Sequence, residues 1–308
     1  MPCSTPPSGA GAHGVLLTTD ADGRVAPDWI AANLAAIRDG AEAVAGRAEI
    51  DPVEARAIPA HLHADDALEC AYADRLDEID WLVDPDPADP WPRHSEDSGA
   101  SIAVTCAAYR RAGGVPALAL GEDRAFIARL RRVDAAIRHA PEIQVVVSGR
   151  IDGRARGGMA DTMRRRIVRQ DEWIDDRLEP AFPRLRRALL RRRFRAARKD
   201  TNRSPSLAHA LGLPPAGLAP SLASPFLGAG WAEIEAQSPV LRRQGVRRAD
   251  LARETAAADV ILARLRASPF NVPAPMVLLT DATRGLSVRC GEKPLQGARS
   301  LASAGCPR

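Results

Sequence analysis

The chain has 308 residues, which is enough for one large α/β domain with an appended region. Hydrophobic residues make up 45% of it and charged residues 27%, as in ordinary globular proteins. No run approaches the ~20 consecutive apolar residues of a membrane-spanning helix, and the first residues lack the basic and apolar regions of a signal peptide. We therefore expect a cytoplasmic protein with at most peripheral membrane contact.

The cysteines and the net charge indicate which kinds of site and partner the protein can have. The five cysteines are widely separated and never form a Cys-x-x-Cys pair, which argues against a disulfide framework or a zinc site. A net charge of +4 suggests an anionic partner such as nucleic acid. However, only Lys199 and Lys293 among the 43 basic residues are lysines. This arginine bias, with abundant Ala, Gly and Pro, is typical of a GC-rich genome, so part of the charge reflects codon usage.

The first predicted elements are a strand, a helix and a strand. Residues 1–13 are rich in Pro, Ser and Gly and are expected to be disordered. Residues 15–17 form a short apolar run of the buried-strand type. Apolar residues at helical spacing over 30–37, ended by Gly40, predict a helix, and residues 43–46 predict a second strand.

The next elements alternate between helix and strand. Residues 61–83 predict a longer helix with one apolar stripe and a strongly acidic opposite face. The proline-rich residues 84–92 predict a loop, because proline lacks the backbone donor a helix interior needs. Beyond it we expect a strand at 100–105, a short helix at 107–112, a helix at 122–132 and a strand at 143–147.

The second half is predicted to be mainly helical. Residues 150–199 hold 17 basic and 7 acidic residues and predict an Arg-rich helical stretch broken by Pro180 and Pro183. Residues 204–228, rich in Pro, Leu, Ser and Ala, suggest a loop, and residues 229–267 return to helix.

The predicted fold class is therefore α/β, with strands and helices alternating over the first half of the chain. An Arg-rich helical region is expected over residues 151–267, and a poorly ordered tail over residues 268–308.

The first candidate site is Asp20-Ala21-Asp22, which follows an apolar strand. Open α/β sheets place their ligands at the carboxyl ends of strands, and residues two apart on an extended segment point the same way. Two such carboxylates can hold Mg²⁺ or Mn²⁺, whose other positions are filled by phosphate oxygens and water. An ordinary Asx turn between a strand and a helix is the alternative.

Three further segments could belong to a site. Glu122 and Asp123 begin a helix and could supply a general base, or could simply favour the first helical turn. The polar segment 94–101 suits a substrate-facing loop, although ordinary loop chemistry explains it equally well. His139 could be a metal ligand, but a solvent-exposed histidine at a helix end is the favoured interpretation.

The order of these motifs resembles that of a family 2 glycosyltransferase. The series runs from Thr18-Thr19-Asp20-Ala21-Asp22 through Gly99-Ala100-Ser101 and Gly113-Gly114 to Gly121-Glu122-Asp123. The resemblance covers residues 14–150. It implies a GT-A fold, a mixed sheet flanked by helices, over these residues. It also implies an inverting displacement in which an acceptor hydroxyl attacks the anomeric carbon of a nucleoside-diphosphate-sugar.

Carried over by motif position, the resemblance assigns roles to the candidate residues. Asp20 and Asp22 become the ligands of the Mg²⁺ or Mn²⁺ ion and the donor diphosphate. Asp123 becomes the catalytic base with Glu122 beside it, and the small residues Gly99, Ala100 and Ser101 line the acceptor side. The partners implied are a nucleotide-sugar donor and a hydroxyl acceptor, with no nucleic acid.

The chain departs from the family pattern before Asp20. Family members place a nucleotide-binding strand and an Asp-x-Ser element ahead of the Asp-x-Asp motif, and only about 13 unpatterned residues stand there in this chain. We therefore expect a GT-A core lacking the nucleotide-base half, and an activity that this loss can abolish. Two alternatives stay open: a non-catalytic remnant that binds a partner through its sheet edge, and a basic protein that binds nucleic acid or an anionic surface through the Arg-rich stretch.

Overall fold

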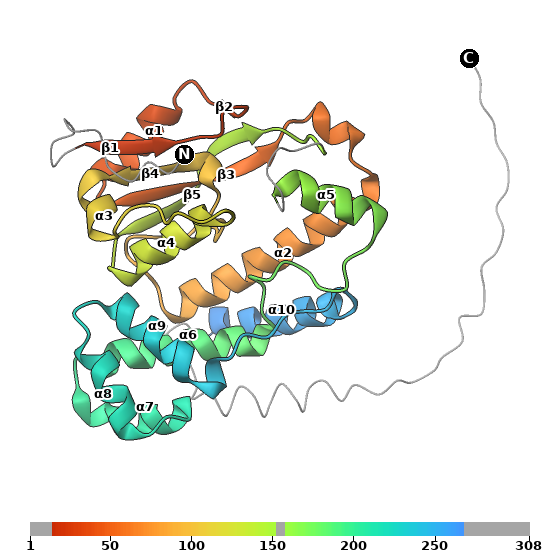
Figure 1. Ribbon diagram of the computed structural model, residues 1–308. Helices are drawn as coiled ribbons and strands as arrows, with labels where there is room; N and C mark the ends of the chain where they lie inside the picture. Colours follow the sequence, from red (N-terminus) through yellow and green to blue (C-terminus); the bar gives the residue numbers. More distant parts are fainter. Residues whose placement is uncertain (1–13, 152–157, 268–308) are drawn as a thin grey trace, which may run out of the picture. The chain divides into compact units, whose positions relative to one another are not determined.

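The structure is a computed structural model that describes residues 14–151 and 158–267. A five-stranded mixed sheet carries helices on both faces, and a helical region follows it in the chain (Figure 1). This arrangement confirms the α/β class. The expected disorder at residues 1–13 and 268–308 falls outside the described residues.

The regular elements follow the chain in this order. The strands are β1 (Val15–Thr18), β2 (Arg24–Val25), β3 (Ala43–Ile50), β4 (Ile102–Thr105) and β5 (Ile137–Val147). The α-helices are α1 (Trp29–Arg38), α2 (Ala60–Val83), α3 (Cys106–Arg111), α4 (Glu122–Arg132), α5 (Met159–Val168), α6 (Ala181–Ala197), α7 (Ser204–Leu211), α8 (Pro215–Ala223), α9 (Leu227–Gln237) and α10 (Leu251–Ala267). Short 3₁₀ turns are η1 (Glu54–Ala57), η2 (Gly99–Ser101), η3 (Thr201–Arg203), η4 (Pro239–Leu241) and η5 (Arg248–Asp250).

The sheet has the strand order β1-β4-β3-β5-β2. Strands β3 and β5 are parallel, whereas β4 is antiparallel to both β1 and β3, and β2 is antiparallel to β5. Consequently β1, β3 and β5 run in one direction, and their carboxyl ends meet at one edge of the sheet.

Both faces of the sheet are covered by helices, because successive strand residues point to opposite faces. On one face Ala43, Ile102 and Val104 pack against α3 and α4 through Tyr109 and Phe126. On the other face α1 covers the sheet, and its Trp29 packs in a cluster with Val44, Ala103 and Val145 (Figure 1). The mainly small aliphatic side chains of the sheet core agree with the low aromatic content of 4%.

Strands β3 and β5 are longer than the apolar runs that predicted them. The hydrophobic runs cover 43–46 and 143–147, but the pairing of β3 with β5 extends over residues with polar side chains such as Arg47 and Glu49. The register shifts between Gly46 and Arg47. A side chain at Gly46 would place its Cβ 2.4 Å from Ser101 Oγ, so this close approach of two segments requires glycine.

The segment 204–228, predicted as a loop, is largely helical. It contains α7 and α8, which pack Leu207, Leu211 and Leu218 into the core of the helical region. The prediction was wrong because prolines stand in the first turns of both helices, where the backbone N–H they lack has no intrahelical partner. The same reasoning applies to α6, whose N-cap is Pro180 and whose first turn contains Pro183. The packing of Leu218 into the core outweighs the further proline, Pro220, inside α8.

Helix α2 packs against α6 and α10 of the helical region, and α4 packs against α9 (Figure 1). The Tyr72 hydroxyl of α2 is buried and donates a hydrogen bond to the Glu179 carbonyl at 2.7 Å. The described residues belong to one compact unit. Within them, no helix has both the length and the apolar character needed to cross a membrane.

The acidic face of α2 and the Arg-rich stretch neutralise one another. Three acidic groups at the helix or its C-terminal cap form ion pairs with arginines of the stretch: Glu69 with Arg166, Asp80 with Arg184, and Asp84 with Arg191 and Arg195. A fourth acidic residue, Asp77, is buried, and its nearest positive charges are those of Arg93 and Arg184. Much of the arginine charge that suggested an anionic partner is therefore compensated inside the molecule.

Candidate functional site

The candidate site lies at the carboxyl edge of β1, β3 and β5. Asp20 and Asp22 follow β1, and Asp51 follows β3 directly. The turn η2 precedes β4, which runs in the opposite direction, so Gly99 reaches the same edge. Ligands of open α/β sheets bind outside the carboxyl ends of strands, so this edge is where a site is expected.

The turn that carries Asp20 and Asp22 connects the two outermost strands of the sheet. In a flat sheet, four strand spacings would separate β1 from β2 by ~19 Å. The six Cα steps from Thr18 to Arg24 reach only ~20 Å when fully extended, and a turn closed by the Gly23 N–H to the Asp20 carbonyl (3.0 Å) shortens them. The sheet must therefore curl, and the turn spans its carboxyl edge.

Four carboxylates from two distant segments gather at this edge. Partial burial raises the pKa of Asp20, and the negative charges of Asp22, Asp123 and Glu122 raise it further. No hydrogen bond or ion pair reaches the Asp20 side chain from any described residue. Asp22 pairs with Arg150, so Asp20 is the carboxylate of the Asp20–Asp22 pair without a cationic partner among the described residues. Two neighbouring carboxylates of this kind suit a divalent metal ion.

Hydrogen bonds hold the segments of the cluster together. The Asp123 Oδ2 atom accepts the Gly99 N–H at 2.9 Å, and the Thr18 hydroxyl donates to the Gly99 carbonyl at 3.1 Å. A Cβ at Gly99 would lie 3.3 Å from the Asp123 Cβ, so the contact is close. Thus the structure brings together the end of β1, the turn η2 and the start of α4.

The small residues of η2 differ in their availability to a ligand. Gly99 lies at the edge, whereas Ala100 and Ser101 are buried. The Ser101 hydroxyl accepts the Trp29 indole N–H at 3.0 Å. The acceptor-side role of the three residues stays a prediction, and the side chain of Ser101 is already engaged in the core.

Sequence reasoning missed a second group of residues at the same edge. A small pocket of about 140 Å³ beside Asp22 is lined by residues that follow β1, β3 and β5: Asp22, Arg24, Asp51, Glu54, Ser148 and Arg150, with Val146 and Val147. Hydrogen bonds from the backbone N–H groups of Glu54 and Val53, and then Arg24, hold the pKa of Asp51 below its usual value. Ser148 follows the predicted strand 143–147, but Asp51 follows β3 only because that strand extends to Ile50, beyond the predicted end at residue 46. Grouping the two also requires knowing that β3 and β5 are parallel neighbours.

The side chains present fit a hard cation that also takes oxygens from a ligand. No group of three or more His, Cys, Asp or Glu side chains is arranged as a complete metal site among the described residues. Mg²⁺ in nucleotide enzymes is commonly held by one or two carboxylates plus phosphate oxygens and water, which is what Asp20 and Asp22 can offer.

His139 lies in a buried charged network and not at an exposed helix end, so that expectation was wrong. It is in β5, is 3% exposed, and its Nδ1 atom lies 2.7 Å from Asp89 Oδ2. Asp89 also pairs with Arg93 at 2.8 Å, and the Asp97 carboxylate pairs with Arg131 at 2.9 Å on the other side of the imidazole. This network ties the proline-rich loop to β5 and α4, which indicates a structural role.

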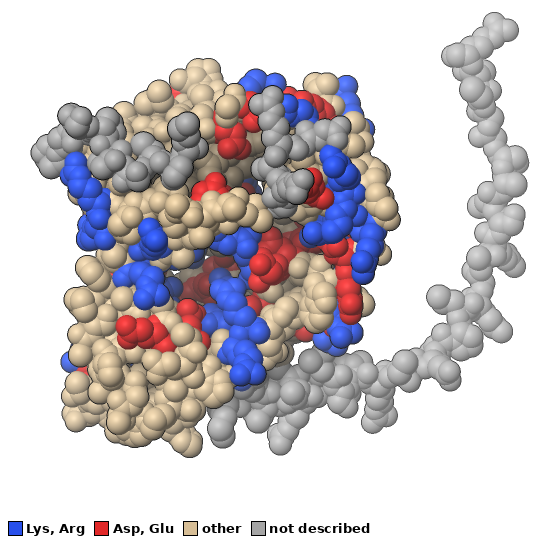
Figure 2. Space-filling model, in the orientation of Figure 1, with Lys and Arg blue, Asp and Glu red and all other residues tan. Residues whose placement is uncertain are grey.

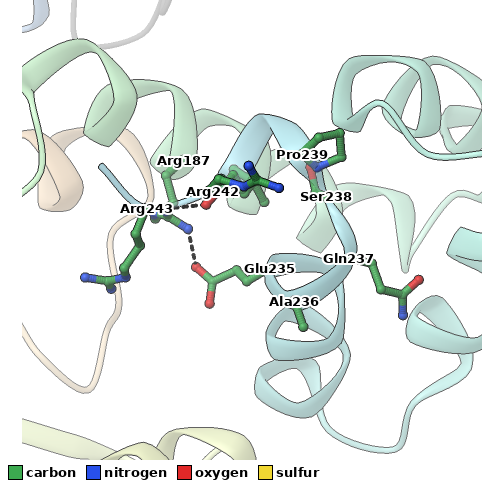
Figure 3. Close-up of a pocket in the computed structure, with 9 residues that line it drawn as sticks. Arg187, Glu235, Ala236, Gln237, Ser238, Pro239, Arg242 and Arg243 are labelled. Carbon is green, nitrogen blue, oxygen red and sulfur yellow. Dashed lines mark hydrogen bonds and ion pairs between the residues drawn. The ribbon is translucent and has the colours of Figure 1, made fainter. Parts of the chain in front are cut away.

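The helical region contains a larger concavity of about 450 Å³ (Figure 3). Arg187 and Glu235 point toward one another there, with Arg187 NH1 2.7 Å from Glu235 Oε1. The other Arg187 donors bond to the Glu179 carboxylate and the Leu241 carbonyl. Because the Arg187 guanidinium is already bonded to protein groups, this concavity is a weaker candidate for ligand binding than the carboxylate cluster, although it is larger.

Comparison with protein-family models, with curated proteins and with solved structures gives no match for this chain.

Proposed function

We propose that the carboxyl edge of the sheet is the metal–diphosphate part of a glycosyltransferase site of GT-A type. The observation that carries this proposal is the gathering of Asp20, Asp22, Glu122 and Asp123, from segments about 100 residues apart in the chain, at one sheet edge. The donor is a nucleoside-diphosphate-sugar and the acceptor a hydroxyl group.

In this proposal Asp20 and Asp22 hold Mg²⁺ or Mn²⁺. A bound divalent ion would neutralise the negative charge that develops on the departing diphosphate. The raised pKa of Asp20 reflects burial and repulsion that a bound cation would relieve.

Asp123 is the proposed general base, with Glu122 beside it. Its Oδ2 accepts the Gly99 N–H at 2.9 Å and its Oδ1 accepts the Arg124 N–H at 2.6 Å, which fixes the orientation of the carboxylate. A carboxylate has about four acceptor positions, so each oxygen can still accept a proton. As the acceptor oxygen bonds to the anomeric carbon, its proton passes to Asp123, and the bond to the diphosphate breaks with its electron pair on the leaving oxygen.

The charge distribution favours this proposal over binding of nucleic acid by the Arg-rich stretch. Arginines of α5 and α6 are paired with Glu69, Asp80, Asp84 and Asp171. Figure 2 shows acidic and basic side chains interspersed on the visible face, where a broad basic surface would suit a phosphate backbone better.

The proposal is tested by donor hydrolysis. The protein is incubated with a panel of nucleoside-diphosphate-sugars, with Mn²⁺ or with a chelator, and nucleoside diphosphate release is measured. We expect Mn²⁺-dependent release that Asp22→Asn abolishes and that Asp123→Asn lowers by about 10²- to 10⁴-fold. The matched control is Asp28→Asn, an exposed carboxylate whose side chain makes no cap hydrogen bond at α1. Release that ignores Mn²⁺ and Asp22 would contradict the proposal.

A further inference from the structure

The pocket beside Asp22 has the size and the donors to take one part of the proposed donor. Its volume of about 140 Å³ is well below the ~300 Å³ of the smallest usual ligand pockets, so it can accept a phosphate group but not a whole nucleotide. Arg24 and Arg150 supply guanidinium groups, which bind phosphate oxygens through paired N–H donors.

The backbone that carries Arg150 is firmly held. The Ser148 hydroxyl donates to Glu54 Oε2 at 2.8 Å, and the Gly149 N–H donates to the same oxygen. A Cβ at Gly149 would lie 2.7 Å from Ile50 Cγ2, so this turn packs closely against the end of β3. The Arg150 side chain, by contrast, is 59% exposed.

The two arginines of the pocket differ in their partners. Arg24 pairs with Asp51, a carboxylate that also accepts the Val53 N–H at 2.7 Å and is only 10% exposed. Arg150 pairs with Asp22, and no other described residue contacts that carboxylate by a hydrogen bond or an ion pair. The guanidinium of Arg150 is thus paired with the same carboxylate that the proposed metal ion would bind, so the two cations compete for Asp22.

The net charge of the pocket determines when it can bind a diphosphate. Its lining holds two cationic side chains and three carboxylates, a net charge of −1, and Asp20 adds to the negative potential nearby. A free diphosphate is therefore disfavoured, and a divalent cation at Asp20 and Asp22 would cancel this negative charge. Exposed ion pairs of this kind are weak, so the pairing of Arg150 with Asp22 can be exchanged readily.

Building on the proposed function, we propose that Arg150 is an exchangeable counter-ion: it neutralises Asp22 in the metal-free protein and moves to the diphosphate oxygens once a divalent cation is held there. Arg150 would then donate its N–H groups to the leaving diphosphate. The exchange imposes an order of binding, with the cation first and the diphosphate second.

The exchange predicts opposite effects of one substitution on two ligands. In Arg150→Gln, affinity for Mn²⁺ alone, measured by electron paramagnetic resonance titration, should rise about 2- to 5-fold because a competing cation is lost. Affinity for inorganic pyrophosphate, measured calorimetrically in saturating Mn²⁺, should fall about 10-fold or more because charge-assisted hydrogen bonds are lost. Without Mn²⁺, the unsubstituted protein should show no pyrophosphate binding.

Two control variants separate exchange from general electrostatics. Arg24→Gln removes the same charge from the same pocket but leaves Asp22 paired, so its Mn²⁺ affinity should change less than that of Arg150→Gln. Arg38→Gln, at the exposed C-terminal end of α1, should change neither affinity.

The outcomes distinguish the two proposals. If the unsubstituted protein binds Mn²⁺ and pyrophosphate but Arg150→Gln leaves both affinities unchanged, or shifts both in one direction, the exchange is refuted and the site survives. Equal tightening of Mn²⁺ binding by Arg24→Gln and Arg150→Gln would refute it as well. No Mn²⁺ binding by the unsubstituted protein would overturn the proposed function and the exchange with it.

Discussion

The buried network around Asp89 makes a sharp prediction about stability. The Asp89 side chain is 5% exposed and receives the His139 backbone N–H at 2.9 Å, while its other oxygen lies 2.7 Å from His139 Nδ1. Arg93 and Arg138 lie within 2.8 and 3.4 Å. Burial alone would raise the pKa of Asp89, but the hydrogen bond and charge of His139, and then the charge of Arg93, lower it below its usual value.

Asp89→Asn keeps the shape of the side chain and removes its charge. The side chains of Arg93 and Arg138 are only 16% and 14% exposed, and both would lose the Asp89 carboxylate as a counter-ion. Removing one member of a buried ion pair costs about 3–5 kcal/mol. Because Arg138 also donates to the Pro90 and Pro92 carbonyls, we expect about 3 kcal/mol, the lower end of that range.

Urea denaturation followed by circular dichroism measures this loss, and calorimetry should show a melting temperature lowered by about 6–12 °C for a domain of this size. The control is Asp86→Asn in the same loop, an exposed side chain that accepts one backbone N–H at 3.0 Å and should cost below about 1 kcal/mol. If Asp89→Asn were as stable as this control, our account of the network would be refuted.

Two further predictions concern pH and packing. Burial, and then the charge of His139, lower the pKa of His94 to about 3, so the unfolded chain binds a proton between about pH 6.5 and 3 that the folded protein does not. Stability should therefore fall as the pH drops through this window, by up to about 1.4 kcal/mol per pH unit, and His94→Gln should flatten the slope of urea midpoints measured from pH 7 to pH 4. In Gly228→Ala the new Cβ would lie 1.8 Å from the Arg131 carbonyl oxygen, so the start of α9 must shift. Asp134 accepts two backbone N–H groups there, and we expect the shift to cost about 3 kcal/mol or more of unfolding free energy. Gly217→Ala, whose nearest contact is 3.4 Å, should be neutral or slightly stabilising, and equal unfolding free energies for the two variants would contradict this packing.

The sequence predicted elements best where local periodicity and packing agree. Helix α4 matches its predicted bounds, because its apolar residues Phe126, Ile127 and Leu130 recur at helical spacing and face the sheet. Strands β3 and β5 were predicted over their apolar halves only, and the two-residue strand β2 was not predicted. The polar half of β3 pairs with β5, and this long-range pairing cannot be predicted from the local hydrophobic pattern.

The candidate site was predictable in part. Asp20, Asp22, Glu122 and Asp123 were all identified from motif order, and the structure gathers them at one edge. Arg150 was missed because its relation to Asp22 depends on the curl of the sheet, which brings β5 and the turn after β1 together. For the same reason His139 was misjudged, since its partner Asp89 lies 50 residues away in a proline-rich loop.

The most direct test of the proposed site is a Mn²⁺ titration monitored by electron paramagnetic resonance. We predict that the protein binds one Mn²⁺ ion in saturable fashion. Asp20→Asn and Asp22→Asn should each weaken this binding at least about 10-fold, because each removes one of only two proposed protein ligands. The control Asp28→Asn should bind as the unsubstituted protein does. Equal Mn²⁺ affinity in all four proteins would contradict the assignment of a metal site to this edge of the sheet.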